Sequence, residues 1–335
     1  MNNQRIVLAS RPAAEPTTAN FRLEEVALAP LDDGQVRVKH HYLSLDPYMR
    51  GRMNDAKSYA QPQPLNETMI GGTVGEVVES RNAKFAVGDK VVGMGGWQQY
   101  STASGKGDIS KVDTTHIPLS AYLGSVGMPG MTAWYGLMKI CEPETGETVC
   151  VDAASGAVGS VVGQLAKLKG MHVVGIAGGV EKCAYVKNEL GFDDCIDYKA
   201  FPDPKAFYQA LKAVTPRGID CHFENVGGTI MDAVMLRMNA FGRVAMCGMI
   251  SGYNGAPIPM MAPQLILQSR LKFQGFIVSE HMNLWPEGLT ELGGYVASGK
   301  IKFRESIADG LANAPQSFLD LLKGKNFGKQ LVKLV

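Results

Sequence analysis

The chain has 335 residues, of which 45% are hydrophobic and 19% are charged, and its 33 basic and 32 acidic residues give a formal net charge of +1 at pH 7. This length exceeds what one hydrophobic core usually organises, so we expect two domains, and the ordinary composition argues against disorder. Charges of both signs are spread along the chain and no apolar run reaches the ~18 residues of a membrane span, so we expect neither a nucleic-acid partner nor a membrane protein.

The N-terminus and the cysteines favour a cytoplasmic protein. Residues 1–10 lack the long apolar run and the small-residue cleavage site of an export signal. The cysteines include no pair two residues apart and no Cys/His cluster with metal-ligand spacing. They are Cys141, Cys150, Cys183, Cys195, Cys221 and Cys247. We expect reduced, mostly buried thiols, because a disulfide framework suits a much smaller secreted chain.

Short β-like runs alternate with turn residues from the start of the chain to about Gly124. These runs are Arg5–Ala9, Arg22–Leu28, Gln35–Leu43, Gly75–Glu79, Lys90–Met94 and Gln98–Thr102. Glycines such as Gly34, Gly72 and Gly88 separate them, and no helix-length periodic segment competes strongly. The pattern predicts a β-rich barrel or sandwich.

After Pro129, apolar strands alternate with helical stretches up to about Ser298. The predicted strands are Thr148–Ala153, His172–Ile176, Cys195–Ile196, Ile219–Glu224 and Arg243–Cys247. The predicted helices are Val158–Lys169, Lys182–Leu190, Pro204–Val214 and Met231–Met238. This alternation is typical of βαβ units around a parallel sheet. The last stretch holds a predicted helix at Ala314–Lys323 and a β-like run at Gln330–Val335. We therefore expect an α/β domain over residues 125–298, and a β-rich domain over 1–124 to which 299–335 returns.

The segment from Thr148 to Gly159 reads as a buried strand, a glycine turn and a helix, which is the context of a dinucleotide-binding fingerprint. Gly156 lets the backbone approach a pyrophosphate, Gly159 permits close helix–strand packing, and the amides at the helix start favour an anion. Ala154 stands where the first glycine is usual. The predicted pyrophosphate loop is Ala154, Gly156, Ala157, Val158 and Gly159. The alternative is a structural strand–turn–helix, but the next strand follows at the right interval and ends in Gly178-Gly179.

The end of that second strand bears on the choice of cofactor. A site that prefers NAD usually places Asp or Glu there, on the adenosine ribose. This strand ends in Ala177-Gly178-Gly179-Val180 without a carboxylate, and Glu181 stands where a helix begins. Lys182 could pair with a ribose phosphate, and a charge-assisted hydrogen bond contributes about 1.5–3 kcal/mol. The pattern favours NADPH, with a solvated helical lysine as the alternative reading of Lys182.

Six motifs are spread along the chain. They are Leu45–Arg50, the turn Gly127–Ala133, the Ala154–Gly159 loop, Glu224–Gly228, Ile250–Asn254 and Asn326–Lys329. Together they resemble the medium-chain dehydrogenase/reductase superfamily, and within it the leukotriene and prostaglandin reductase branch, which includes bacterial curcumin reductases and plant double-bond reductases. The resemblance implies a GroES-like domain made of both chain ends, a central Rossmann domain with a doubly wound parallel sheet, a cofactor in the cleft between them, and a homodimer.

The resemblance also implies roles for single residues. Lys182 and Tyr198 would hold the adenosine phosphate, and Asn225 would lie along the cofactor, although core or turn roles suit Tyr198 and Asn225 equally well without the family. The positions around the nicotinamide and its ribose are Thr132, Cys247, Phe276, Val278 and Asn326. Tyr253 would lie near the substrate carbonyl oxygen, unless it is a surface aromatic that only shapes the pocket. The second candidate for the pocket wall is Tyr48. Met260 and Met261, among prolines, form either an adaptable apolar lid or ordinary packing.

The resemblance argues against a metal. Zinc-dependent relatives carry Gly-His-Glu where this chain has Gly71-Gly72-Thr73, and a cysteine near Asp46. The six histidines are scattered, and we assign none of them a catalytic role. Without a metal to polarise a carbonyl, hydride addition to the carbon–carbon double bond of an enone or enal is the more natural chemistry. An NADPH quinone reductase and a non-catalytic NADPH-binding protein are the alternatives.

Overall fold

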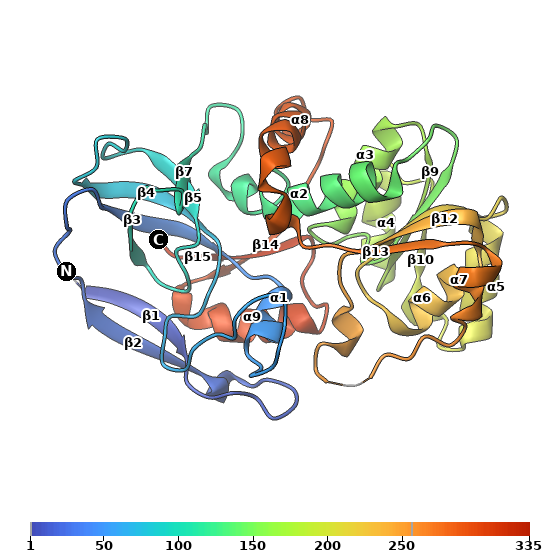
Figure 1. The fold of residues 1–335 in the computed structure, drawn as a ribbon, viewed down its shortest axis with the longest axis horizontal. Helices are drawn as coiled ribbons and strands as arrows, with labels where there is room; N and C mark the ends of the chain where they lie inside the picture. The colour runs from blue at the N-terminus through green and yellow to red at the C-terminus, as the bar shows by residue number, and fades with distance from the viewer. Residues whose placement is uncertain (1, 256) are drawn as a thin grey trace. The chain divides into compact units, whose positions relative to one another are not determined.

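The computed structural model describes residues 2–255 and 257–335, which fold into two compact units (Figure 1). One unit extends to Leu123 and takes in Glu305–Val335, so it is built from both ends of the chain. The other unit is Gly124–Arg304. None of the helices in the described ranges combines the length and the apolar character needed to cross a lipid bilayer.

The first unit is rich in β-strands, as the sequence predicts, and most of its strands pair antiparallel. Its main sheet has the order β14, β15, β3, β4, β5 and β7, with β6 paired to β3, and β1 pairs separately with β2. The strands are β1 (Asn2–Leu8), β2 (Phe21–Ala27), β3 (Val36–Ser44), β4 (Thr73–Ser80), β5 (Lys90–Gly93), β6 (Tyr100–Ala103), β7 (Ile109–Lys111), β14 (Glu305–Asp309) and β15 (Lys329–Lys333). The helical segments are α1 (Tyr48–Arg52), α9 (Ala314–Leu322) and the 3₁₀ turns η1 (Thr18–Asn20), η2 (Leu119–Leu123) and η7 (Leu311–Asn313). Helix α1 was not predicted because a helix of 5 residues is too short to show a helical period.

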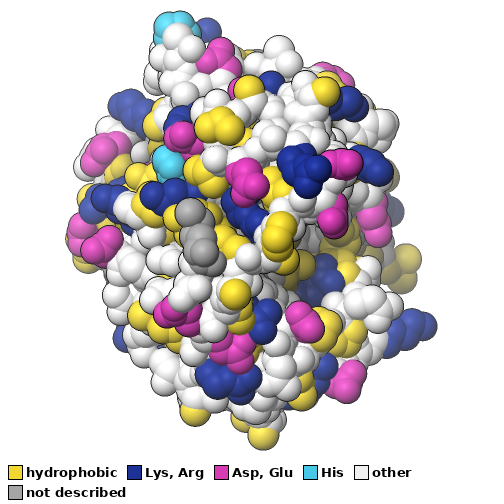
Figure 2. Space-filling model, turned by 90° about the vertical axis from the view of Figure 1, so that its left-hand side faces the viewer, with side chains coloured by type: hydrophobic (Ala, Val, Ile, Leu, Met, Phe, Trp, Pro, Cys, Tyr) yellow, Lys and Arg dark blue, Asp and Glu magenta, His cyan; other side chains and the backbone are white. Residues whose placement is uncertain are grey.

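Charged side chains of both signs are mixed on the surface of the first unit. Figure 2 shows lysine and arginine side chains alternating with aspartate and glutamate over this face. Ion pairs near the surface of this unit include Lys111 with Asp89 at 2.7 Å and Lys323 with Glu15 at 2.8 Å. Exposed pairs of this kind each contribute little to stability. The mixed surface agrees with the near-neutral net charge of the chain.

A buried ion pair ties the C-terminal strand to the N-terminal part of the first unit. Lys329 on β15 donates to Asp46 Oδ1 at 3.1 Å and to the Leu45 carbonyl oxygen at 2.8 Å. The Lys329 and Asp46 side chains are only 4% and 8% exposed. Burial lowers the pKa of Lys329, and the negative charge of Asp46 opposes that shift. Each charge therefore depends on the other, since a buried charge without a partner is strongly destabilising.

The second unit contains a parallel sheet of six strands in the order β10, β9, β8, β11, β12 and β13. The strands are β8 (Thr148–Val151), β9 (His172–Ala177), β10 (Asp194–Asp197), β11 (Ile219–Glu224), β12 (Met238–Met246) and β13 (Lys272–Gly275). The order reverses at β8, which is typical of a doubly wound sheet. The predicted combination of a Rossmann sheet and a β-rich domain is confirmed.

Helices cover both faces of this sheet. They are α2 (Met128–Tyr135), α3 (Gly159–Leu168), α4 (Val180–Asn188), α5 (Pro204–Val214), α6 (Gly228–Met235), α7 (Gln264–Gln268) and α8 (Trp285–Ala297), with the π-helical turn η3 (Gly136–Cys141) and the 3₁₀ turns η4 (Tyr198–Ala200), η5 (Ile250–Gly252) and η6 (Val278–Leu284). Helix α2 packs against α3 and α8, and α5 packs against α6 (Figure 1). The predicted bounds of α5 and β11 are those of the structure.

The segment Gly127–Ala133, which we expected to be a turn, is mostly helix α2. Pro129 lies in the first turn of this helix, where its missing N–H costs nothing. A Cβ on Gly130 would collide with the carbonyl oxygen of Ser125, so this glycine serves close packing. Proline and glycine in sequence usually indicate a turn. Here Pro129 begins a helix and Gly130 allows a close contact with Ser125, and the sequence pattern does not reveal that contact.

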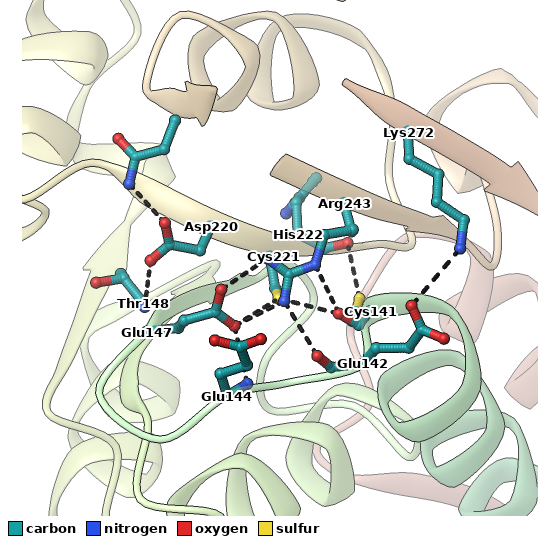
Figure 3. Close-up of polar contacts among 11 residues, drawn as sticks. Cys141, Glu142, Glu144, Glu147, Thr148, Asp220, Cys221, His222, Arg243 and Lys272 are labelled. Atoms are coloured by element: carbon teal, nitrogen blue, oxygen red, sulfur yellow. Dashed lines mark hydrogen bonds and ion pairs between the residues drawn. The ribbon is translucent and has the colours of Figure 1, made fainter. Parts of the chain in front are cut away.

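The amino ends of the central strands are fixed by a polar cluster around Arg243 (Figure 3). Arg243 on β12 forms two parallel hydrogen bonds with Glu147, at 2.7 and 2.6 Å, and a third with the Cys141 carbonyl oxygen at 2.7 Å. Asp220 on β11 accepts a hydrogen bond from the backbone of Thr148 on β8 at 2.8 Å. These contacts hold β8, β11 and β12 together at the end of the sheet opposite the strands' carboxyl ends.

The buried pair in the first unit gives a stability prediction. Lys329→Met should lower the free energy of unfolding by about 3–5 kcal/mol, because it leaves the Asp46 carboxylate buried without its partner. Urea unfolding at pH 7 measures the loss. The double variant Lys329→Met, Asp46→Leu should recover much of it, since both charges are then removed. An unchanged unfolding midpoint in the single variant would contradict the structural importance of the pair.

Candidate functional site

The carboxyl ends of the central strands carry most of the residues predicted to contact a cofactor. The order of the sheet places β9 on one side of β8 and places β11 and β12 on the other. In doubly wound sheets, ligands bind in the crevice that this reversal opens. The structure thus brings the loop 153–158, Gly178, Asn225 and Cys247 to one edge of the sheet.

The loop between β8 and α3 has the tight geometry predicted for it. Ala153 adopts a left-handed φ of 44°, and its carbonyl oxygen accepts a hydrogen bond from Gly156 N at 2.8 Å. A Cβ on Gly159, the first residue of α3, would lie 2.5 Å from the same oxygen, so this position requires glycine. Gly156, Ala157 and Val158 are only partly buried. Their backbone amides at the start of a helix suit an anion.

Ala154 replaces the usual first glycine of the fingerprint, and the neighbouring strand accommodates it. Ala154 is fully buried, and its N–H donates to the Ile176 carbonyl oxygen on β9 at 3.0 Å. A Cβ on Gly175, in the same strand, would lie 2.9 Å from the Ala154 methyl carbon. The methyl group therefore fills space that Gly175 leaves open, and the substitution does not disturb the loop.

Tyr198 and Lys199 lie over the end of β9. A Cβ on Gly178 would be 2.9 Å from a ring carbon of Tyr198 and 3.0 Å from Cε of Lys199. Asp197 Oδ1 accepts hydrogen bonds from Gly179 N at 2.7 Å and from Lys199 N at 3.0 Å. The Asp197 carboxylate thus joins the ends of β9 and β10, and this brings Tyr198 beside Gly178.

Two ammonium groups interact at this corner. Burial lowers the pKa of Lys182, near the start of α4, and the positive charge of Lys199 lowers it further, while Glu181 opposes the shift. Lys182 is half-buried and Lys199 is exposed; their like charges repel each other, and an anion bound beside both would relieve the repulsion. Sequence reasoning named Lys182 but missed Lys199, whose only sequence signal is that it directly follows Tyr198 after a short strand.

The turn after β11 is held by buried polar groups that the sequence pattern did not reveal. Asn225 donates to Asp152 Oδ1 from its backbone at 2.7 Å and to the Asp152 carbonyl oxygen from its side chain at 3.1 Å. Glu224 and His222 are buried beside Asp152. Within the described ranges, these three side chains are the one group of histidine, cysteine or acidic residues whose ligand atoms are close enough to hold a metal ion, all within 4.8 Å of one another.

Tyr253 lies next to this turn. The loop that carries Tyr253 is attached to the turn by hydrogen bonds from Ile250 N to the Asn225 carbonyl oxygen and from Ser251 N to the Val226 carbonyl oxygen, both at 3.1 Å. A Cβ on Gly248 would lie 3.1 Å from the Tyr253 hydroxyl oxygen and 3.4 Å from the Asn225 carbonyl oxygen. The structure therefore brings the predicted catalytic hydroxyl close to a predicted cofactor residue.

The residues expected around the nicotinamide occupy several elements of the second unit. Cys247 follows β12, and burial raises the pKa of its thiol to about 12. The Thr132 hydroxyl donates to a carbonyl oxygen of its own helix, α2. Phe276 follows β13, and its ring lies 5.4 Å from that of Tyr135 on α2. Val278 is buried at the start of η6. Their contacts with a cofactor stay predictions.

The remaining predicted site residues lie elsewhere in the chain. In the first unit, Tyr48 is half-buried at the start of α1 with the Arg52 guanidinium 6.0 Å from its ring centre, and burial raises the pKa of the Tyr48 hydroxyl. Asn326, also in the first unit, donates to the Gly328 carbonyl oxygen at 2.7 Å. Met260 is half-buried in the loop after η5. Their predicted contacts with cofactor or substrate stay predictions.

Two family models match the chain. One, described as the N-terminal domain of oxidoreductase, matches residues 4–112, and the other, described as zinc-binding dehydrogenase, matches residues 157–293. The chain is 46% identical to the NADPH-dependent curcumin reductase of Escherichia coli, over 99% of this chain and 97% of that protein. The chain belongs to the medium-chain dehydrogenase/reductase family.

Other proteins similar to this medium-chain dehydrogenase/reductase are also named as reductases. Prostaglandin reductase 1 of Rattus norvegicus is 44% identical over 95% of each chain, and the NADP+-dependent 2-alkenal reductase of Nicotiana tabacum is 40% identical over 99% and 97%. The crystal structure of CurA from Vibrio vulnificus in complex with NADPH has a TM-score of 0.93, with 46% identity and 99% of both chains covered. A mycobacterial quinone oxidoreductase, 20% identical with a TM-score of 0.74 over 99% and 100% of the chains, shares the fold.

The close approach of Gly159 to the Ala153 carbonyl oxygen gives a prediction. Gly159→Ala should destabilise the protein by about 1–3 kcal/mol, because the added Cβ meets backbone rather than a flexible side chain. The matched control is Gly294→Ala in α8, where a Cβ meets nothing within 4 Å; this change should leave stability unchanged or raise it slightly. Thermal unfolding compares the two variants, and equal midpoints would contradict the steric argument.

Proposed function

We propose that the protein is an NADPH-dependent reductase that transfers a hydride to the carbon–carbon double bond of α,β-unsaturated ketones or aldehydes. The observation that carries this proposal is 46% identity, over nearly the whole of both chains, to a relative named for NADPH-dependent reduction of curcumin. Relatives named for prostaglandin and 2-alkenal reduction support the same class of substrate.

The residues at the end of β9 fit the phosphate that distinguishes NADPH from NADH. We assign Lys182, Lys199 and Tyr198 to this phosphate, because the two ammonium groups repel each other and lie beside the exposed glycine turn. Asp197 Oδ1 accepts hydrogen bonds from Gly179 N and Lys199 N, so this carboxylate oxygen serves the backbone of the turn. The amides of Gly156–Val158 would meet the pyrophosphate.

Bound NADPH supplies the hydride. As the hydride reaches the β-carbon of the substrate, the electrons of the double bond move toward the carbonyl group and negative charge develops on its oxygen. We assign Tyr253 to donate a hydrogen bond to that oxygen. Its hydroxyl lies over Gly248 beside the Asn225 carbonyl, so its position is set by the same turn that we assign to the cofactor.

We further propose that the reaction needs no zinc. Asp46 stands near the position at which zinc-dependent relatives carry a cysteine, and it is already engaged by Lys329 at 3.1 Å. Gly72 stands where the Gly-His-Glu motif has its histidine and offers no side-chain ligand, and the Thr73 hydroxyl, where the motif has its glutamate, already accepts a hydrogen bond from Gly95 N at 3.2 Å. A glycine, a hydrogen-bonded hydroxyl and a paired carboxylate offer poor ligands for a metal. The cytoplasmic location and the homodimer stay predictions from the sequence; light scattering tests the dimer.

The function is tested with purified protein and a panel of acceptors. NADPH oxidation should be fastest with a linear alkenal, a curcuminoid or a prostaglandin-like enone, and it should persist in the presence of EDTA. Faster turnover of a quinone would favour a quinone reductase instead. Tight NADPH binding without oxidation by any acceptor would indicate a non-catalytic NADPH-binding protein, and loss of activity in EDTA would overturn the zinc-independent mechanism.

The phosphate assignment makes a prediction about cofactor choice. Lys182→Ala and Lys199→Ala should each raise the KM for NADPH by about ten- to a hundredfold, the equivalent of one charge-assisted hydrogen bond, and leave the KM for NADH nearly unchanged. Lys205→Ala, at an exposed position on α5, is the control and should change neither value. If Lys199→Ala behaves like the control, Lys199 does not contact the phosphate.

The assignment of Tyr253 predicts a loss of turnover without a loss of cofactor. Tyr253→Phe should lower kcat for an enone by about 10²-fold, since it removes one hydrogen-bond donor to the developing negative charge. The Kd of NADPH, measured by fluorescence titration, should stay within experimental error. Tyr208→Phe on α5 serves as the control for a tyrosine away from the site. Wild-type kcat in the Tyr253 variant would remove it from the mechanism.

A further inference from the structure

Two carboxyl groups meet at the carboxyl ends of β8 and β11. Asp152 follows β8, Glu224 ends β11, and both side chains are fully buried. The two strands are paired in parallel, with Phe223 opposite Val151, so the two acidic residues come next to each other in register. A carboxyl oxygen of each side chain lies within 4.8 Å of the other, and a ring nitrogen of His222 lies within the same distance of both. Two carboxyl groups this close in the protein interior repel each other strongly when both are ionised, and binding one proton relieves the repulsion.

The surrounding donors decide which group carries the proton. Glu224 Oε1 accepts hydrogen bonds from Val226 N at 2.6 Å and Gly227 N at 2.7 Å, and Oε2 lies 3.1 Å from His222 Nε2. Burial would raise the pKa of Glu224, but the hydrogen bonds from His222, Asp152 and Gly227 hold it at about 2. Burial and the neighbouring Glu224 carboxylate raise the pKa of Asp152. The proton of the pair is therefore assigned to Asp152.

The same pair fixes the backbone of the turn that follows β11. Asp152 Oδ1 accepts from Asn225 N at 2.7 Å, and Oδ2 accepts from Val226 N at 3.2 Å. The Glu224 carbonyl oxygen accepts from Cys247 N at 2.9 Å and from the next amide in the chain at 3.1 Å. The loop that carries Tyr253 is thus attached to a turn whose amides point at the two carboxyl groups.

We propose that Asp152 and Glu224 act as a one-proton carboxyl pair that positions the Asn225 turn, and through it the Tyr253 loop, so that alkaline removal of the shared proton loosens the cofactor site. This inference rests on the proposed function, because it takes Asn225 and Tyr253 as cofactor and substrate residues. Asp152 and Glu224 are positioning residues, since they act through the turn.

A metal ion is a weaker explanation of the same cluster. His222 Nδ1 lies 3.0 Å from the Cys150 carbonyl oxygen, and its Nε2 faces Glu224. The carboxylate oxygens already accept from the backbone amides of Asn225, Val226 and Gly227. A cation placed among these oxygens would lie close to the positively polarised hydrogens of the N–H groups, and this electrostatic contact is unfavourable.

The pH dependence follows from the groups that face the pair. They are His222 and Glu224 on β11, the Cys150 thiol on β8 and the Cys247 thiol after β12. Burial, followed by the charges of Asp152 and Glu224, raises the pKa values of both thiols, so they stay neutral when the pair titrates. Because the pKa of Asp152 is raised in the folded state, folding retains a proton that the unfolded chain loses. Stability from this group is therefore present in acid and is lost as the pH rises through the folded pKa.

Asp152→Asn is the informative variant, because an amide can accept from Asn225 N and donate to Glu224 without titrating. Val226 N keeps its stronger partner, Glu224 Oε1, at 2.6 Å. Between pH 6 and pH 10, the Tm of the wild-type protein without cofactor should fall more steeply than that of the variant. The Kd of NADPH should rise in the wild type relative to the variant, by at most about tenfold per pH unit for one proton.

Each outcome bears on a separate claim. Parallel Tm curves for wild type and Asp152→Asn would overturn the shared proton, whatever the function. Diverging Tm curves with parallel NADPH affinities would overturn the positioning role and leave the proposed function to the acceptor panel. A rise in wild-type Tm on addition of Zn²⁺, absent in the variant, would replace the proposal with a metal site. If Asp152→Asn fails to fold, the infrared band of a neutral carboxylic acid in the wild type at pH 6, above the ordinary titration range of carboxyl groups, decides the claim, because its absence would overturn it.

Discussion

The parallel pairing of β8 with β11 in the middle of the sheet is the constraint on which the site depends. The pairing places the glycine turn after β8 beside the turn after β11, because parallel strands end at the same edge. Asp152 and Asn225 are then close enough for three hydrogen bonds. The Tyr253 loop is attached to the same turn through backbone amides. One strand register therefore sets the relative positions of the proposed pyrophosphate loop, the proposed cofactor residue Asn225 and the candidate catalytic hydroxyl.

Two pairs of like-charged groups lie along this edge, and burial makes them behave differently. Asp152 and Glu224 are fully buried, so ionising both costs more free energy than binding one proton between them. We propose that this one proton holds the pair together. Lys182 is half-buried and Lys199 is exposed, so an anion from solution can reach both and relieve their repulsion. The first pair supports the architecture of the site, and the second suits the phosphate of the proposed cofactor.

Close packing explains why the glycine fingerprint can vary at one position and not at another. At Gly159 the obstacle is a backbone carbonyl oxygen, which cannot move without breaking the turn. At Ala154 the methyl group enters space left by Gly175 on the adjacent strand. The glycine positions thus share one tightly packed space between two strands and a helix. A larger residue is tolerated at one of these positions when the residue packed against it is small.

The sequence by itself placed strands β8 to β12 and helices α3 to α6 of the Rossmann unit, including the bounds of α5 and β11, because hydrophobic period and glycine spacing are local properties. It also singled out the glycine turn between β8 and α3 and the side chain of Lys182. Only the tertiary structure showed that Gly127–Ala133 is mostly helix, that Lys199 joins Lys182, and that Asp152 meets Glu224. Each of these depends on which strand ends and helices become neighbours. Strand order joins residues far apart in the chain, and no local pattern records it.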